Sequence, residues 1–178
     1  MNIIESPIPG VFRIEPRILR DERGFFARDY CEQEYAKHGL ETGFAQCNMS
    51  YNKQRGIIRG MHFQTAPHQE IKLVRCTRGA IFDVVVDNRP DSPTYLQWFG
   101  AELSEENRHV LYVPRGFAHG YQTLTEDAGV YYQVSTPYAP DFEGGLRWND
   151  PAIGIEWPTT DTDVISVSAK DAAWPLID

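Results

Sequence analysis

Glycine and proline recur at short intervals along this chain of 178 residues, which contains 14 of the first and 12 of the second. Both residue types bend or end regular elements, so that only short elements fit between them. The runs between them are rich in β-branched and aromatic residues, which favour strands. These runs are Val11–Leu19, Leu73–Thr77, Ala80–Asp87, Tyr95–Leu103, His109–Val113 and Val130–Ser135. Many short strands separated by turns predict an all-β sandwich or barrel.

Other local patterns refine this prediction. The run from Ile81 to Asp87 is apolar on both faces for much of its length, as in a central strand. One helix is expected, over Cys31–His38, with Gly39 as its C-terminal cap. Ser104–Asn107 is expected to form a turn between two strands. No repeat, low-complexity tract or long linker divides the sequence, so we expect residues 1–178 to form a single domain.

Composition argues against several classes of partner. The chain has 25 acidic and 17 basic residues, a net charge of −8, which provides no basic footprint for nucleic acid or an anionic membrane. No stretch approaches the roughly 20 apolar residues of a membrane helix, and residues 1–16 do not resemble a signal peptide. The three cysteines form no Cys-x-x-Cys pair, so we expect reduced thiols and a cytoplasmic location. Cys47 and Cys76 are expected to be small buried hydrophobic residues.

Two glycine-containing segments resemble the paired motifs of cupins, which are small double-stranded β-helix, or jelly-roll, barrels. The first runs from Arg59 through His62 and Gln64 and is followed by Glu70 and Gly79; the second is Pro114–His119. Metal-binding cupins place His-x-His and a later Glu in the first motif and one His in the second. Because Gln64 replaces the second imidazole, only His62 and His119 remain. Gln64 and Glu70 could complete only a weak site, so we expect no metal.

The same strands carry groups suited to proton transfer. Period-2 alternation places His62 on the face of Gln64, and it places Lys72 among apolar neighbours, where an ammonium is costly unless a charge or a ligand meets it. Tyr132 and Tyr131 then lie on opposite faces of one strand.

These groups suit proton abstraction next to a carbonyl. A neutral imidazole is a base well matched to pH 7, a lysine can stabilise the enolate, and a tyrosine on the other side can return a proton. Ordinary structural roles compete with this interpretation. His38, His68 and His109 are expected to be surface or core residues, the tyrosines fit core or rim positions equally well, and Arg59 and Arg115 fit solvated positions. These patterns alone therefore indicate a cupin-like barrel with an unassigned small-molecule site.

Longer motifs resemble the dTDP-4-dehydrorhamnose 3,5-epimerase family in the same order, from about Gly10 to Pro175. They are Asp21–Phe26, Gln46–Ser50, Arg59–Gln64, Lys72–Arg75, Pro114–Gly120, Trp148–Pro151 and Ser168–Asp171. The resemblance implies a homodimer without metal or redox cofactor. It also implies a reaction, the conversion of dTDP-4-dehydro-6-deoxy-D-glucose to dTDP-4-dehydro-L-rhamnose by inversion at C3 and C5.

The resemblance also assigns roles to individual residues. His62 would be the base, Asp171 its orienting partner, Tyr132 the acid on the opposite sugar face, and Lys72 a cation near the ketone oxygen. Tyr138 would stack on the thymine. The other positions implied to bind the nucleotide sugar are Arg23, Gln46, Asn48, Arg59, His119, Glu143 and Lys170.

The sequence departs from the family two positions after Arg-Gly-Phe-Phe, where the family has Glu and this chain has Arg28, followed by Asp29. This reversal of charge leaves alternatives open for the nucleotide, the sugar and the carbons inverted. A single-site epimerase at C3 or C5 and a keto-isomerase would use the same groups. A binding module without activity would be expected to lack at least one of His62, Lys72, Tyr132 and Asp171, all of which are present.

Overall fold

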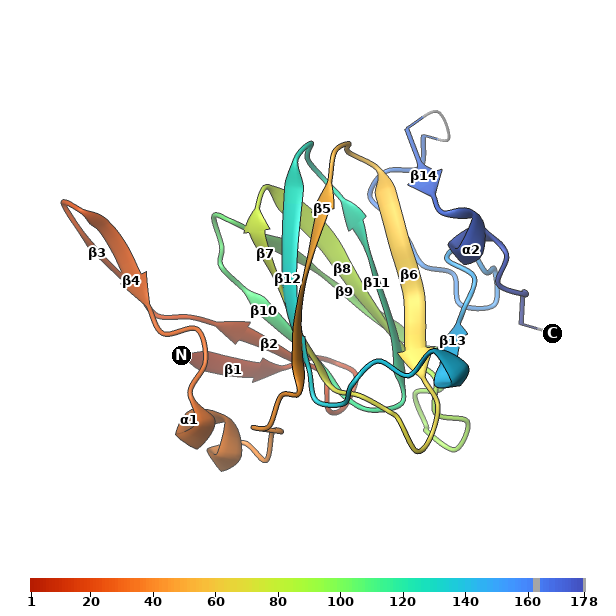
Figure 1. Ribbon diagram of the computed structural model, residues 1–178, viewed down its shortest axis with the longest axis horizontal. Coiled ribbons are helices and arrows are strands. Elements are labelled where there is room, and N and C mark those ends of the chain that lie inside the picture. The colour runs from red at the N-terminus through yellow and green to blue at the C-terminus, as the bar shows by residue number, and fades with distance from the viewer. Residues whose placement is uncertain (162–163, 178) are drawn as a thin grey trace.

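Two antiparallel sheets face each other in the computed structural model, which describes residues 1–161 and 164–177 (Figure 1). The first sheet has the order β1 (Asn2–Glu5), β2 (Phe12–Glu15), β10 (Val110–Val113), β7 (Lys72–Arg78), β12 (Ala128–Val134) and β5 (Gln46–Asn52). The second has the order β13 (Glu143–Gly145), β6 (Ile57–Gln64), β11 (Phe117–Thr123), β8 (Ala80–Asp87) and β9 (Trp98–Ser104). A short strand, β14 (Ser166–Val167), pairs in parallel with β6. The prediction of an all-β, cupin-like jelly roll is confirmed.

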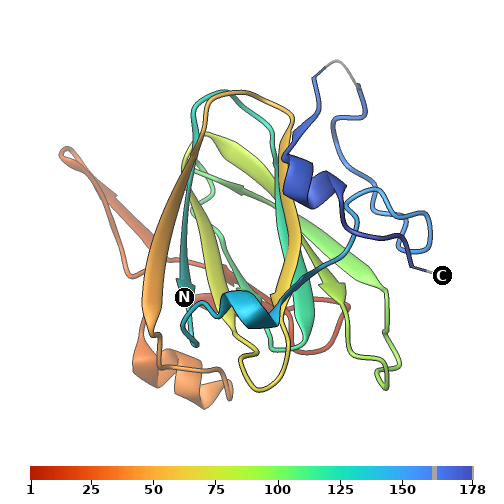
Figure 2. The ribbon, with the colours of Figure 1, turned by 45° about the vertical axis from the view of Figure 1, so that its right-hand side comes forward.

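A separate hairpin, β3 (Ile18–Asp21) and β4 (Gly24–Ala27), projects away from the two sheets (Figure 1). The helical elements are α1 (Glu32–Lys37), the 3-10 turn η1 (Pro140–Phe142) and α2 (Ala169–Ala172). Figure 2 shows α2 beside β6, at the edge of the second sheet. No helix in the described part of the chain has the length and apolar character needed to cross a membrane.

Most predicted elements are present, with boundaries that local chemistry explains. Strand β8 coincides with the predicted run and lies between β11 and β9. Helix α1 lies within 31–38, and Gly39 follows it with φ of 69°, a left-handed conformation that favours glycine. The predicted strand Val11–Leu19 is instead two strands, β2 and β3, because Pro16 between them lacks an N–H for the ladder.

Apolar residues fill the space between the sheets and also cover their outer faces. Val74, Val85 and Leu111 belong to the cluster between the sheets, whereas Val84 and Val86 belong to a cluster on the outer side of the second sheet. This is why the 81–87 run is apolar on both faces. Cys76 is buried, as predicted, and Ser104 and Asn107 close the predicted turn by reciprocal backbone-to-side-chain hydrogen bonds.

The prediction that Cys47 is buried is wrong, because this thiol is exposed. Its strand β5 lies at the edge of the first sheet, and alternate side chains on its outer face, Cys47, Met49 and Tyr51, point to solvent. Period-2 alternation gave no indication of which face of an edge strand the rest of the chain covers.

Asp87 anchors the loop between β8 and β9. Its side chain is fully buried and accepts hydrogen bonds from Arg89 Nε and Nη2 at 2.8 Å and from the hydroxyls of Ser92 and Thr94 at 2.6 Å. Burial raises the pKa of Asp87, but these hydrogen bonds lower it by more, so the pKa lies well below its ordinary value. The carboxylate is therefore more stable in the folded than in the unfolded chain.

We expect Asp87→Asn to lower the free energy of unfolding at pH 7 by about 2–3 kcal/mol, because it removes charge-assisted hydrogen bonds. Because the pKa of Asp87 is lower in the folded than in the unfolded chain, its carboxylate stabilises the fold fully above the unfolded-state pKa and loses this effect as the pH falls further. The difference in free energy of unfolding between wild type and variant should therefore narrow below about pH 4. Urea unfolding at pH 7 and pH 3 measures this gap. Asp91→Asn, at an exposed neighbouring position, should change nothing. A gap independent of pH would contradict the account.

Candidate active site

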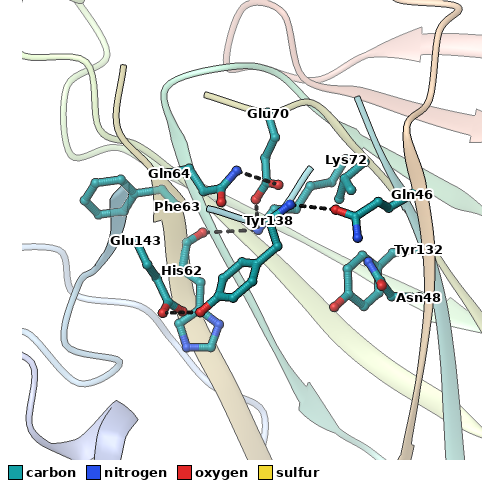
Figure 3. Close-up of a pocket in the computed structure, with 11 residues that line it drawn as sticks. Gln46, Asn48, His62, Phe63, Gln64, Glu70, Lys72, Tyr132, Tyr138 and Glu143 are labelled. Carbon is teal, nitrogen blue, oxygen red and sulfur yellow. Dashed lines mark hydrogen bonds and ion pairs between the residues drawn. The ribbon is translucent and has the colours of Figure 1, made fainter. Parts of the chain in front are cut away.

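A pocket of about 410 Å³ opens between the two sheets (Figure 3). Both sheets and the segment after β12 contribute to it. Its lining residues are Gln46, Asn48, His62, Phe63, Gln64, Glu70, Lys72, Tyr132, Val134, Tyr138 and Glu143. Seven of the predicted site residues thus share one cavity: Gln46, Asn48, His62, Lys72, Tyr132, Tyr138 and Glu143.

His62 and Asp171 form a hydrogen-bonded pair, with Nε2 and Oδ1 2.6 Å apart. Asp171 is 4% exposed, and its other oxygen accepts a hydrogen bond from the Gly60 amide at 3.3 Å. Burial raises the pKa of Asp171, but the hydrogen bonds from His62, Gly60 and Ser168, together with the charge of a protonated His62, lower it by more. An ionised Asp171 assigns the ring proton to Nε2, and Nδ1, which makes no hydrogen bond to any described residue, is the nitrogen that can accept a proton.

Lys72 is buried at the inner end of the pocket, with 8% of its surface exposed. Its Nζ lies 3.1 Å from Glu70 Oε1 and donates to the backbone oxygen of His62 at 3.4 Å. The charge that the sequence led us to expect beside this ammonium is therefore Glu70. The two contacts aim the ammonium into the pocket next to His62 (Figure 3).

Tyr132 reaches the same pocket from the opposite sheet, because it lies on β12 and His62 lies on β6. Burial is the main cause that raises its pKa, and the nearby Tyr121 and Glu70 raise it further. The hydroxyl therefore stays protonated at neutral pH and can donate. The neighbouring Tyr131 points to the other side of the strand, where its ring centroid lies 5.4 Å from the guanidinium carbon of Arg75.

A second histidine–aspartate pair lies behind the pocket. His119 is directly opposite His62 in the β6–β11 ladder, is 8% exposed, and places Nε2 2.8 Å from Oδ1 of the fully buried Asp83. Burial raises the pKa of Asp83, and the charges of His119 and Lys72 offset this only in part. His119 is not among the lining residues of the pocket. Our sequence analysis missed Asp83, although a carboxylate inside the apolar run 81–87 was a signal.

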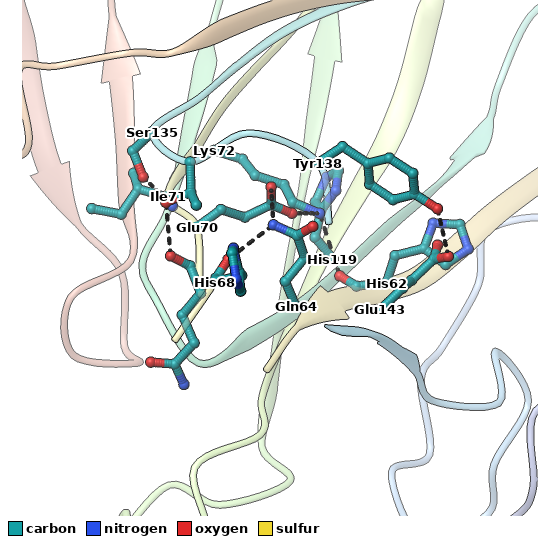
Figure 4. Close-up of polar contacts among 12 residues, drawn as sticks. His62, Gln64, His68, Glu70, Ile71, Lys72, His119, Ser135, Tyr138 and Glu143 are labelled. Atoms are coloured by element: carbon teal, nitrogen blue, oxygen red, sulfur yellow. Dashed lines mark hydrogen bonds and ion pairs between the residues drawn. The ribbon is translucent and has the colours of Figure 1, made fainter. Parts of the chain in front are cut away.

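Tyr138, Glu143 and Lys170 form the rim of the pocket. The Tyr138 amide donates to Gln46 Oε1 at 2.6 Å, and its hydroxyl donates to Glu143 Oε2 at 2.9 Å, so that the residue spans the opening. Lys170 Nζ lies 2.6 Å from both oxygens of Glu143. The ring of Tyr138 remains exposed at this rim (Figures 3 and 4).

Arg59 lies on the other side of His62. Its Nε donates to Asn52 Oδ1 at 2.8 Å, and the residue is exposed. Together with His62, Lys170 and Asp171 it lines a second cavity, of about 470 Å³. Two cationic side chains, Arg59 and Lys170, thus line this cavity.

The structure does not bring Arg23 to the pocket. Arg23 lies beside the tip of the β3–β4 hairpin, where its side chain is 83% exposed and pairs with Asp21. Arg28, which replaces the family's Glu, pairs with Glu34 at 3.6 Å. Asp29 forms an ion pair with Arg75 and does not line the pocket of its own chain.

The side chains considered as metal donors are engaged elsewhere (Figure 4). Gln64 accepts from the Ala139 amide at 2.6 Å and donates to the backbone oxygen of His68 at 2.9 Å, while Glu70 faces Lys72. Among the described residues, no group of three or more His, Cys, Asp or Glu side chains is arranged to hold a metal ion. The pocket presents proton-transfer groups and an ammonium in their place.

The chain is similar to known proteins over nearly its whole length. A family model described as dTDP-4-dehydrorhamnose 3,5-epimerase matches residues 5–178. A relative of that name from Salmonella typhimurium is 46% identical over 179 residues, which cover 100% of this chain and 96% of the relative.

Solved structures agree with this similarity. A dTDP-6-deoxy-D-glucose-3,5-epimerase from Legionella pneumophila, in complex with dTDP-4-keto-L-rhamnose, superposes with a TM-score of 0.92 at 39% identity and covers 98% of this chain and 92% of that one. A 3'-monoepimerase from Streptomyces bikiniensis, in complex with dTDP-quinovose, has a TM-score of 0.90 at 32% identity, with 97% and 86% covered. From these matches, the chain belongs to the dTDP-4-dehydrorhamnose 3,5-epimerase family.

Proposed function

We propose that this protein inverts both C3 and C5 of dTDP-4-dehydro-6-deoxy-D-glucose and produces dTDP-4-dehydro-L-rhamnose. One observation carries the proposal: His62, paired with Asp171 behind it, and Tyr132 line one pocket from opposite sheets, and the buried Lys72 lines the same pocket. C3 and C5 both flank the C4 ketone, so a base, an enolate stabiliser and an acid on the opposite face are sufficient for both inversions.

His62 acts as the base at each carbon. Its Nδ1 removes the proton next to the ketone, and Asp171 stabilises the imidazolium that forms without itself becoming protonated. The electron pair of the broken C–H bond moves to the ketone oxygen. Lys72 stabilises this oxyanion, because its buried ammonium is held in place before the charge develops.

Tyr132 returns a proton to the opposite face of the carbon. Its raised pKa keeps the proton available at neutral pH, and its hydroxyl faces the pocket. Abstraction on one face and protonation on the other give inversion. His62 then releases its proton to solvent and the Tyr132 phenolate takes one up, so that both groups are restored for the second carbon.

The remaining site residues suit the nucleotide part of the substrate. The exposed ring of Tyr138 can stack on the thymine, and Arg59 and Lys170 can pair with the diphosphate. Gln46, Asn48 and Glu143 line the pocket and offer hydrogen-bonding groups to the sugar and nucleotide. His119 lies on the adjacent strand β11, pairs with Asp83 and does not line the pocket, so we assign it a supporting place behind His62 and no direct contact with the substrate.

We further propose that the protein is a homodimer in which the β3–β4 hairpin of one copy completes the pocket of the other. The hairpin projects from the barrel (Figure 1). Its side chains Leu19, Phe25, Phe26 and Arg23 are exposed. Exposed apolar side chains on a projecting hairpin are typical of an interface. A second copy would give Arg23 a place at a substrate site.

A single-site epimerase is the second candidate, because the Streptomyces bikiniensis monoepimerase shares this fold with a TM-score of 0.90. The two functions require the same base and the same stabilised enolate. They differ in which carbons exchange a proton.

We expect His62→Ala to reduce turnover by roughly 10²–10⁴ or more, because it removes a positioned base, and Asp171→Asn to be severely impaired. Both should still bind dTDP, because the rim residues are unchanged. Product formation by NMR and dTDP binding by calorimetry separate the two effects. Wild-type turnover by purified His62→Ala would refute the mechanism.

Tyr132→Phe should uncouple proton exchange from inversion. His62 can still remove and return protons on its own face, so deuterium from the solvent should enter the sugar while the inverted product falls much further. Tyr131→Phe is the matched control, because that ring lies outside the pocket beside Arg75. The measured quantity is the ratio of deuterium incorporation to product. An unchanged ratio in Tyr132→Phe would remove this tyrosine from the mechanism.

Mixing two inactive variants tests the shared site. We expect Arg23→Ala and His62→Ala each to be impaired alone. After subunit exchange, half of the dimers are mixed and hold one intact site, so about a quarter of wild-type activity should return. If Arg23 served its own chain, mixing would restore nothing.

A further inference from the structure

Asp171 is carried by a segment that has little stability of its own. Helix α2 has four residues, a single turn, and such a helix is not stable in water without neighbours. Before the helix, β14 pairs two residues with β6, and Ser168 Oγ caps the turn by accepting from the Asp171 amide at 3.0 Å. The position of Asp171 therefore depends also on what holds the chain after α2.

Two side chains from the segment after β13 hold that stretch of backbone. Arg147 Nε donates to the backbone oxygen of Trp174. Asp150, 2% exposed, accepts the Ile177 amide on Oδ2 at 2.7 Å and the Ala152 amide on Oδ1 at 2.8 Å. The buried carboxylate thus ties its own loop to the end of the chain.

The Trp174 side chain also holds this part of the chain in place, because its ring packs against β13. A Cβ built on Gly145 would lie 2.1 Å from Trp174 Cε2, so the ring packs directly against a backbone that has no side chain. Gly145 is paired with His62 in the β13–β6 ladder. The Trp174 ring therefore packs on Gly145, the residue paired with His62.

We infer that Arg147, Asp150 and Gly145, which we call the C-terminal clamp, position Asp171 against His62 by fixing the chain at Trp174 and Ile177. They are positioning residues, since none of them lines the pocket. Asp150 belongs to the Trp148–Pro151 motif, which has no part in the proposed reaction and would have this positioning role instead. Its consequence for activity rests on the proposed function, but its geometric content does not.

The direct test reads the hydrogen bond itself. The nitrogen chemical shift of His62 Nε2, in histidine-labelled protein and assigned by its disappearance in His62→Ala, reports whether Asp171 is in place. We expect Asp150→Asn to move this shift to the value found in Asp171→Asn, because an amide has one acceptor oxygen where the clamp needs two. Asp87→Asn is the matched control: it also alters a buried carboxylate that holds a loop, but at β8, and should leave the shift as in wild type.

Activity provides the second readout. Asp150→Asn should lower kcat at least about tenfold and change KM by less than about threefold, since it disturbs the base and not the rim. When Asp150→Asn is introduced into the Asp171→Asn variant, kcat should fall by less than about a further twofold, because both changes act through the contact between Asp171 and His62. Asp87→Asn should have the same small effect in both backgrounds. All variants are compared below their melting temperatures.

Gly145→Ala tests the clamp by a second route, since its methyl group displaces the Trp174 ring and removes no polar contact. It should give the same nitrogen shift as Asp150→Asn. A wild-type shift in both clamp variants, or equal losses from Asp150→Asn in the two backgrounds, would overturn the inference. Failure of the wild-type protein to invert the sugar would instead refute the proposed function, and full activity in Asp171→Asn would refute the role of Asp171 in it; in either case the shift measurement would still decide the clamp.

Discussion

The hydrogen bond between His62 Nε2 and Asp171 Oδ1, at 2.6 Å, joins parts of the chain that lie 109 residues apart. A nearly buried carboxylate is costly unless hydrogen bonds and an opposite charge compensate it, and here His62 and the Gly60 amide do so. Both lie on β6, so α2 docks on a strand of the second sheet. The base of the reaction is thereby oriented by α2, more than 100 residues farther along the chain.

The interior between the sheets is divided between apolar packing and paired charges. Aliphatic side chains of β7, β8 and β10 fill the core, while Lys72 and His119 approach the pocket, each beside its own carboxylate, Glu70 and Asp83. Charges removed from water interact more strongly, so Glu70 holds the buried Lys72 ammonium firmly at the pocket. Lys72 can serve an oxyanion because Glu70 and the His62 carbonyl already hold it in place.

Local chemistry allowed much of the fold to be predicted from the sequence. The central strand 80–87, the helix before Gly39 and the faces of His62, Lys72 and Tyr132 follow from periodicity and capping, which act over a few residues. Strands β5, β6 and β11 are not among the predicted runs, because glycines and polar side chains interrupt their apolar pattern.

Long-range features could not be derived in this way. No spacing rule relates Asp171 to His62, so only the family resemblance indicated that pair, and Asp83 went unnoticed because its partner His119 lies on another strand. The exposure of Cys47 depends on which strand lies at the sheet edge, and the distance of Arg23 from the pocket depends on the direction of a hairpin. Strand order, hairpin direction and contacts between distant residues are set by the tertiary structure and not by local sequence.

Proton NMR of dTDP-4-dehydro-6-deoxy-D-glucose incubated with the wild-type protein in deuterated water tests the central claim most directly. One base and one acid on opposite faces of a shared ketone predict deuterium at both C3 and C5 and a product with both centres inverted. Exchange at only one of these carbons would show a single-site epimerase, and transfer of the carbonyl to C3 would show a keto-isomerase. Either result would contradict the double inversion.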